Sequence, residues 1–130
     1  MSASFPYDRA YDPPAPVVPL LIAPPGGESG ALVGGLLDSG ADCTLIPPSL
    51  ARTLRLPTVG FVEIAGVGGG GGSAPAYAGQ VDLAGTRFLA RLVAYEDHVI
   101  IGRDLLNRFV TTLDGLRLEV GLSGPGHQAR

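Results

Sequence analysis

Glycine and proline set the strongest limit on how this chain can fold. Twenty glycines and twelve prolines are spread through its 130 residues, and they divide the apolar residues into short runs. A helical bundle needs long uninterrupted segments, whereas a sheet with many turns is built from runs of this length. The sequence therefore predicts one mostly β domain. A domain of this size buries roughly two-thirds of the surface that its unfolded chain exposes, so it needs neither a metal nor a disulfide for stability.

Charge and cysteine content exclude several classes of protein. The chain has 9 basic and 12 acidic residues and a net charge of −3, which is unlike the basic footprint of a nucleic-acid-binding domain. Every basic residue is arginine, and the lack of lysine excludes a lysine Schiff base and a P-loop. The single cysteine excludes an intrachain disulfide and the common cysteine metal motifs. We therefore expect no cofactor, no metal and no nucleic-acid partner.

The two ends of the chain differ from its middle. The N-terminus has no signal-peptide pattern, and the apolar stretch over residues 15–25 is too short and too rich in proline to cross a membrane. We expect residues 1–14 to form a flexible arm, residues 15–121 the folded domain, and residues 122–130 a flexible tail. We also expect a cytoplasmic protein, or the soluble part of a longer anchored one.

Short strands account for most of the middle of the chain. Two short helices are expected at residues 50–54, after a Pro-Pro-Ser start, and at residues 103–108, after Gly102. Asp114-Gly115 is typical of a two-residue type I′ turn. The strands are expected at residues 17–23, 31–37, 43–46, 59–65, 76–83, 88–95, 99–101, 110–113 and 116–120.

Three segments could carry chemistry. The first is Asp38-Ser39-Gly40-Ala41, where the aspartate follows an apolar strand and Gly40 allows a tight turn. Two interpretations are open: a simple turn, because these residue types are common in turns, or a rigidly placed carboxylate with a hydroxyl neighbour.

The second segment is the glycine run at residues 66–72. It formally contains GxGxxG, but a dinucleotide site needs a helix directly after it, and residues 73–76 have no helical period. A flexible linker and a mobile hairpin tip that closes over an extended ligand both stay open.

The third segment, residues 99–106, is an apolar triplet that enters Gly102 and a short helix. It could be a core strand and a capped helix. Arg103 lies beside the end of a buried strand, where a guanidinium needs a carboxylate partner, and Asp42 is a candidate for that partner.

The three segments together resemble one family. LLDSGAD at residues 36–42, IAGVGGGGG at 64–72 and VIIGRDLL at 99–106 are similar, in order and spacing, to motifs of the retropepsin-like aspartic proteases. These are single-domain, homodimeric relatives of retroviral proteases, and the resemblance covers residues 17–120. It implies an all-β fold, namely a retropepsin-like closed β-barrel with a flap hairpin and one or two short helices. It also implies an aspartic endopeptidase.

The resemblance assigns a role to each residue of the first motif. Asp38 matches the catalytic aspartate. Ser39 matches the hydroxyl residue that braces the two active-site loops against each other, and Gly40 matches the residue whose carbonyl meets the substrate backbone. Ala41 belongs to the same supporting turn.

The other two motifs are assigned in the same way. Asp42 matches a carboxylate that supports the site and touches the substrate main chain, and Arg103 matches the arginine that pairs with it. The glycine run matches the flap, so substrate contacts are expected from Gly66, Val67, Gly68, Gly69 and Gly70. The glycine run is longer than the family pattern, and the terminal arms do not match the interleaved terminal strands of the viral dimers.

The proposed chemistry needs two chains. In aspartic proteases, two carboxylates about 3 Å apart share one proton, and one of them acts as base on a water. This chain holds a single Asp-Ser-Gly, so we expect a homodimer in which each copy supplies Asp38. The hairpin at residues 110–120 is a candidate for the dimer contact. We expect an extended peptide or protein substrate, apolar pockets and an acidic pH optimum.

The protease interpretation has one alternative, a binding or dimerisation module that keeps this fold but cleaves little.

The remaining candidate side chains are expected to have structural or surface roles. Cys43 is expected to be a small core residue. His98 and His127 have no ligand-like partner in the sequence, and Glu96-Asp97 is expected to be a solvated turn.

Overall fold

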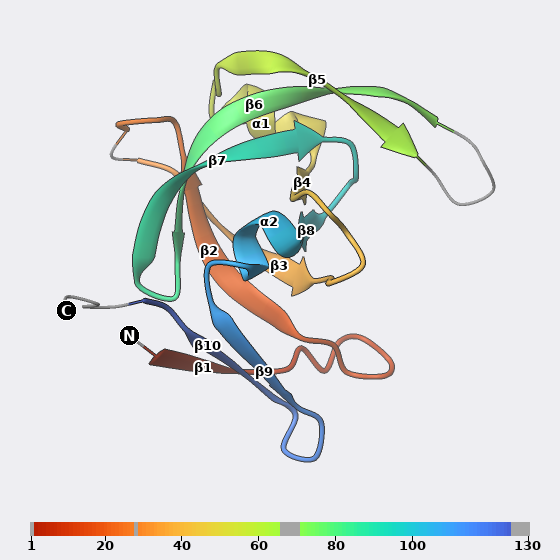
Figure 1. The fold of residues 1–130 in the computed structure, drawn as a ribbon, viewed down its shortest axis with the longest axis vertical. Helices are drawn as coiled ribbons and strands as arrows, with labels where there is room; N and C mark the ends of the chain where they lie inside the picture. The colour runs from red at the N-terminus through yellow and green to blue at the C-terminus, as the bar shows by residue number, and fades with distance from the viewer. Residues whose placement is uncertain (1, 28, 66–70, 126–130) are drawn as a thin grey trace.

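A closed barrel is the centre of the molecule. The computed structural model describes residues 2–27, 29–65 and 71–125. One sheet has the strand order β2-β3-β8-β4-β7-β6-β5, and an extra pairing of β2 with β6 closes six of these strands into a mixed barrel (Figure 1). Its strands are β2 (Val17–Ala23), β3 (Ala31–Leu37), β4 (Leu45–Ile46), β5 (Thr58–Ala65), β6 (Gly71–Leu83), β7 (Thr86–Ala94) and β8 (Val99–Ile101).

A second, three-stranded sheet lies below the barrel in the view of Figure 1. It contains β1 (Ser2–Pro6), β9 (Val110–Asp114) and β10 (Glu119–Ser123) in the order β1-β10-β9. Two short helices complete the fold, α1 (Pro48–Thr53) and α2 (Arg103–Leu106). The predicted all-β fold with a closed barrel and two short helices is confirmed.

The barrel interior holds the apolar residues that alternate along the strands. Val18, Leu20 and Ile22 on β2 are almost fully buried, whereas Pro19 between them is exposed. The triplet of β8 is buried throughout, as expected for a strand covered on both faces. Gly35 on β3 makes room for this strand, because a Cβ there would lie 2.7 Å from Ile101 Cδ1. This packing fixes the ends of β3 and β8, which carry the first and third motifs.

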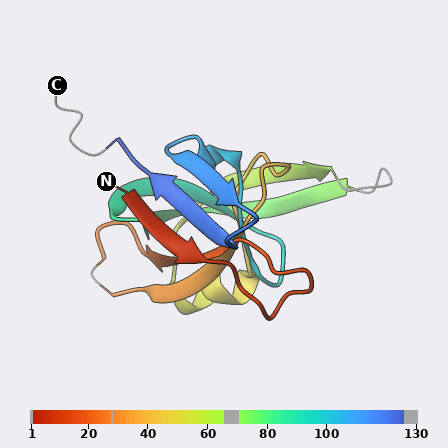
Figure 2. The same ribbon diagram turned by 90° about the horizontal axis from the view of Figure 1, so that it is seen from below.

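The N-terminal segment differs from the expected flexible arm. Ser2–Pro6 forms β1, which pairs antiparallel with β10 from Ser2 opposite Ser123 to Pro6 opposite Glu119. Figure 2 shows β1, β10 and β9 side by side. The alternation of Ser2–Pro6 is that of a strand, and Phe5 packs against the core, which orders a segment that the sequence alone left free. Strand β10 likewise extends to Ser123, into the segment expected to be a tail.

The hairpin turn at the C-terminal end was also predicted incorrectly. Residues 115–118 form a four-residue turn between β9 and β10, in place of a two-residue type I′ turn at Asp114-Gly115. The carboxylate of Asp114 accepts a hydrogen bond from the Arg117 backbone N–H at 3.0 Å, and Leu118 has a φ of +55°. The side chain of Asp114 therefore stabilises a wider turn than the dipeptide indicates.

Neither helix in the described part of the chain is long and apolar enough to span a membrane.

Candidate active site

Asp38 lies in a tight turn at the end of β3. Its backbone N–H donates to the carbonyl of Ile101 on β8 at 3.0 Å, and its own carbonyl accepts from the Ala41 N–H at 3.1 Å. Its Oδ1 accepts from the Gly40 N–H at 2.8 Å. A Cβ on residue 40 would lie 3.1 Å from that same oxygen, so glycine lets the carboxylate keep this bond. The turn orients a carboxylate that stays exposed in the single chain.

Arg103 ties this turn to α2. Its Nη1 donates to the carbonyl oxygen of Ser39 at 2.7 Å, and its backbone N–H donates to the carbonyl of Ala41 at 2.8 Å. The expected Arg103–Asp42 pair is wrong for the chain as described: the ion pairs found among the described residues do not include it. The guanidinium reaches the main chain of the turn, which offers it a carbonyl, while Asp42 is exposed to water.

Two polar residues that the sequence analysis missed lie behind the turn. Thr44 is fully buried, and its hydroxyl donates to Asp104 Oδ1 at 2.7 Å and accepts from the Gly102 N–H at 3.1 Å. Asp104 also accepts from the backbone N–H groups of Thr44 and Leu105, at 3.2 and 2.9 Å. This network joins β4 to α2. A threonine in an otherwise apolar segment, and an acidic residue directly after Arg103, were the signals for it.

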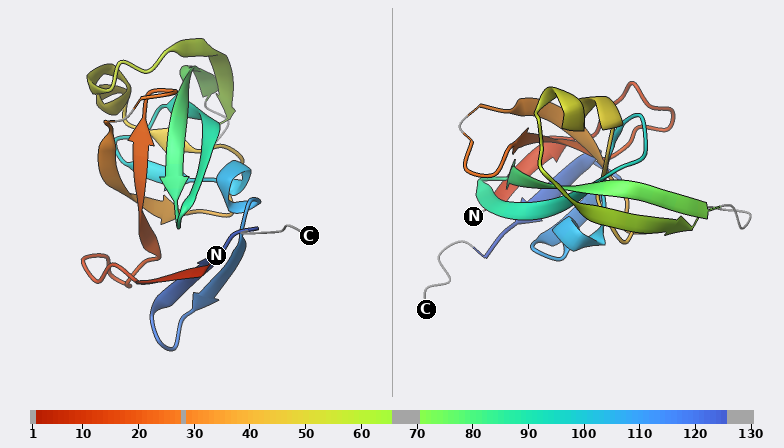
Figure 3. Two further views of the ribbon diagram at one scale, coloured as in Figure 1. Left: turned by 90° about the vertical axis from the view of Figure 1, so that its left-hand side faces the viewer. Right: turned by 90° about the horizontal axis from the view of Figure 1, so that it is seen from above.

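A cleft of about 470 Å³ opens beside the turn. Its lining includes the segment from Gly40 to Cys43 and the end of β5 from Val62 to Ala65. Strands β5 and β6 pair as a hairpin up to Ala65 opposite Gly71, and this hairpin extends away from the barrel (Figures 1 and 3). The expected flap residues Gly66, Val67, Gly68, Gly69 and Gly70 lie outside the described residues. The glycine run leads into β6 and not into a helix, which contradicts a dinucleotide site.

The cleft is more charged than expected. Four charged residues line it, namely Asp42, Glu63, Arg91 and Arg103. The low charge content of the whole chain predicts apolar pockets. The structure gathers a disproportionate share of those charges at one place, which composition does not reveal.

Cys43 belongs to both the core and the cleft wall. It packs with Ala74, Ala76 and Val93 in a small buried cluster, as expected. Burial raises the pKa of its thiol, and the negative charge of Asp42 raises that pKa further. The thiolate is therefore scarce at neutral pH, which is unsuited to a nucleophile.

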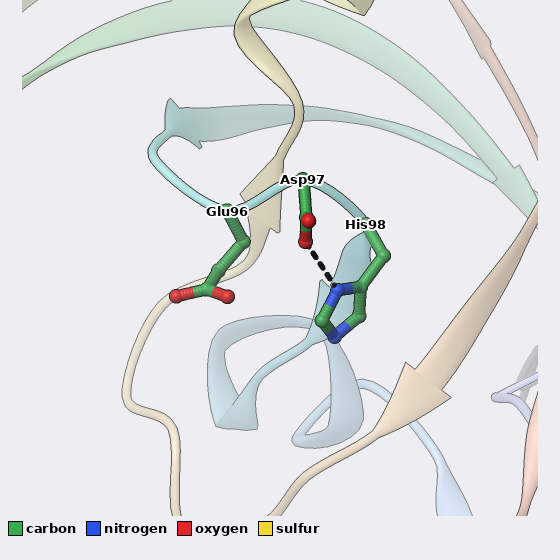
Figure 4. A group of neighbouring side chains, drawn as sticks. All are labelled: Glu96, Asp97 and His98. Carbon is green, nitrogen blue, oxygen red and sulfur yellow. Dashed lines mark hydrogen bonds and ion pairs between the residues drawn. The ribbon is translucent and has the colours of Figure 1, made fainter.

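The turn before β8 brings Glu96, Asp97 and His98 together (Figure 4). Their ligand atoms lie within 4.8 Å of one another, and His98 Nδ1 lies 2.9 Å from Asp97 Oδ1. This hydrogen bond lowers the pKa of Asp97. His98 thus has a carboxylate partner that the sequence analysis did not foresee. The group sits on an exposed turn and is not among the residues that line the cleft. His127 lies outside the described residues.

Comparison with solved structures identifies the fold. A retropepsin-like aspartic protease from Rickettsia conorii aligns with a TM-score of 0.61 and 16% identity, over 94% of this chain and 91% of that one. The protease of EIAV, solved with an inhibitor, aligns with a TM-score of 0.58 and 23% identity, over 72% of this chain and 86% of that one. The retroviral protease-like domain of Ddi1 from Leishmania major aligns with a TM-score of 0.52 and 20% identity, over 89% of this chain and 98% of that one.

The class of fold is therefore retropepsin-like. No family model and no curated protein sequence matches the chain. The structural neighbours are aspartic proteases. In this chain Asp38 lies exposed in a turn at the end of β3, and Gly40 of that turn lines the cleft.

Proposed function

We propose that this protein is an aspartic endopeptidase whose active site forms when two copies each contribute Asp38. The observation that carries the proposal is the turn itself: one exposed carboxylate at the end of β3, held by the Gly40 N–H, in a turn whose residues Gly40, Ala41 and Asp42 line a cleft. A single copy offers half of the pair of carboxylates that the reaction needs.

The chemistry follows from two carboxylates that share one proton. The ionised Asp38 accepts a proton from a water, whose oxygen attacks the carbonyl carbon of the peptide bond. The protonated Asp38 of the other copy donates its proton to the carbonyl oxygen, which gives a tetrahedral diol. When the C–N bond breaks, the nitrogen takes the proton that the first Asp38 received from the water. A hydroxyl of the diol gives its proton to the second Asp38 as the carbonyl reforms, so the pair again holds one proton. Since one carboxyl must be protonated and one ionised, activity falls at both ends of an acidic pH range.

The substrate is proposed to bind as an extended strand. The end of β5 and the Gly40 turn line the same cleft, so a peptide bound in it is proposed to pair its backbone with both. Ser39 is proposed to brace the turn against that of the second copy. Gly40 and Asp42 are proposed to meet the substrate main chain, while Ala41 and Arg103 hold the turn in place.

Cleavage of a diverse peptide mixture from pH 3 to 7 tests the proposal. The wild-type chain is expected to cleave, and Asp38→Asn is expected to be silent while its thermal unfolding stays unchanged. Cleavage by both proteins would refute the role of Asp38. A folded, dimeric wild-type chain that cleaves nothing would instead favour the binding or dimerisation module.

A further inference from the structure

The three-stranded sheet has an unprotected edge. Among the strands of the described residues, β9 pairs with β10 alone, and its first four residues, Val-Thr-Thr-Leu, are uncharged strand formers without proline. Val110 and Leu113 are 69% and 56% exposed, and Leu116 in the adjoining turn is fully exposed. Soluble proteins usually protect such an edge with charge, proline or a covering segment, because it pairs readily with another strand.

The opposite edge of the same sheet is protected. Strand β1 ends in Pro6, which has no N–H to offer, and it lies against the barrel: Ala3 and Phe5 share a hollow with Leu20 and Leu32. The contrast between the two edges indicates that β9 is the one left open for a partner.

The open edge and the catalytic turn share one face of the molecule. A hollow of about 400 Å³ is lined by Leu37, Ser39 and Arg103 on the side of the turn, and by Thr111 and Leu113 of β9 on the other. The Thr111 hydroxyl is buried and, among the described residues, it alone has a buried side-chain polar atom without a hydrogen-bond partner. A partner that pairs with β9 would therefore also lie close to Asp38.

We propose that β9 pairs antiparallel with β9 of a second copy, so that one six-stranded sheet of order β1-β10-β9-β9-β10-β1 spans the dimer. This inference rests on the proposed function, which needs a second Asp38 beside the first. Antiparallel pairing of two identical strands generates a two-fold axis, and the same axis relates the two Asp38 carboxylates, whose turns lie on the side of β9 that would face the partner. A second copy therefore supplies both hydrogen-bond partners for the β9 edge and the second Asp38. An unrelated peptide bound to β9 would supply only the hydrogen-bond partners.

The termini are not exchanged in this dimer. Each β1 pairs with β10 of its own chain over five residues, so both terminal strands are already engaged within one copy. The interface consists of main-chain hydrogen bonds between the two β9 strands, with Val110 and Leu113 covered on opposite faces of the new sheet.

The matched pair Leu113→Lys and Leu89→Lys tests the interface. Both leucines are exposed on strands, at 56% and 62%, and only Leu113 lies on β9. A lysine at 113 appears twice near the two-fold axis, so it is expected to raise the dimer dissociation constant at least about tenfold in sedimentation equilibrium, whereas Leu89→Lys leaves it unchanged. Cleavage by Leu113→Lys is expected to recover as protein concentration rises.

Crosslinking gives a positive readout of the same geometry. Thr112 is exposed at the middle of β9, and antiparallel neighbours have Cα atoms about 4.5 to 5.5 Å apart, within reach of a disulfide. Thr112→Cys is expected to form a disulfide dimer on oxidation, while Val59→Cys on exposed β5 is not.

The outcomes separate the interface from the function. A wild-type dimer that loses activity in Asp38→Asn but is unaffected by Leu113→Lys, and does not crosslink at 112, would overturn the β9 interface and leave the dyad standing. A wild-type chain that is monomeric at every concentration yet cleaves through Asp38 would overturn both.

Discussion

Replacing Thr44 with valine tests whether the hydrogen bonds of the buried Thr44 side chain stabilise the fold behind the Asp38 turn. Valine has nearly the same shape as threonine but no hydroxyl. The change removes the hydrogen bond to Asp104 at 2.7 Å and the bond from the Gly102 N–H at 3.1 Å. Asp104 keeps its bonds to the Thr44 and Leu105 N–H groups, whereas the Gly102 N–H loses its side-chain partner.

The expected cost follows from these two losses. A hydrogen bond to a charged group contributes about 1.5 to 3 kcal/mol, and a buried N–H left without a partner costs about 1 to 3 kcal/mol. Valine leaves no unpaired polar atom of its own, so we take the lower part of both ranges and expect a loss of about 3 kcal/mol in the free energy of unfolding.

Urea denaturation at one fixed protein concentration measures this loss. Thr44→Ser is the control, because it keeps the hydroxyl and removes one methyl group, at a cost of about 1 kcal/mol. If Thr44→Val lay within about 0.5 kcal/mol of wild type, or cost no more than Thr44→Ser, the network would not stabilise the turn.

Three further predictions concern the same region. Gly102→Ala is expected to cost about 2 kcal/mol or more of stability in urea denaturation, because its Cβ would overlap the Cys43 carbonyl; a wild-type midpoint would contradict this. Arg103→Met is expected to lower kcat/KM at least about tenfold in a peptide assay, because the Ser39 carbonyl loses its donor at 2.7 Å; an unchanged value would refute the positioning role. Alkylation of Cys43 is expected to reach its half-maximal rate at a higher pH than alkylation of a cysteine in a short unstructured peptide, since burial and the Asp42 charge raise the pKa of the thiol. Asp42→Asn is expected to lower that midpoint, and an upward shift would contradict the electrostatic cause.

The sequence predicts the barrel well because its signals are local. The runs at residues 17–23, 31–37 and 99–101 are apolar and bounded by turn residues, and each forms a strand with those bounds. The fold therefore follows from short runs and from the spacing of three motifs.

The errors come from contacts that no local pattern records. Ser2–Pro6 becomes a strand because β10, more than a hundred residues later, offers it an edge. The partner of Arg103 is a main-chain carbonyl, which has no signature in the sequence. Arg91 and Glu63 both line the cleft because β5 and β7 both pair with β6. Each of these depends on tertiary arrangement.

Mixing wild-type and Asp38→Asn chains tests the central claim most directly. The two chains are refolded together in equal amounts, so that copies pair at random, and cleavage is compared with that of wild type alone at the same total concentration. If each active site needs Asp38 from two copies, only wild-type pairs are active and about a quarter of the activity remains. If each chain carried a complete site, about half would remain, and that result would contradict the shared dyad.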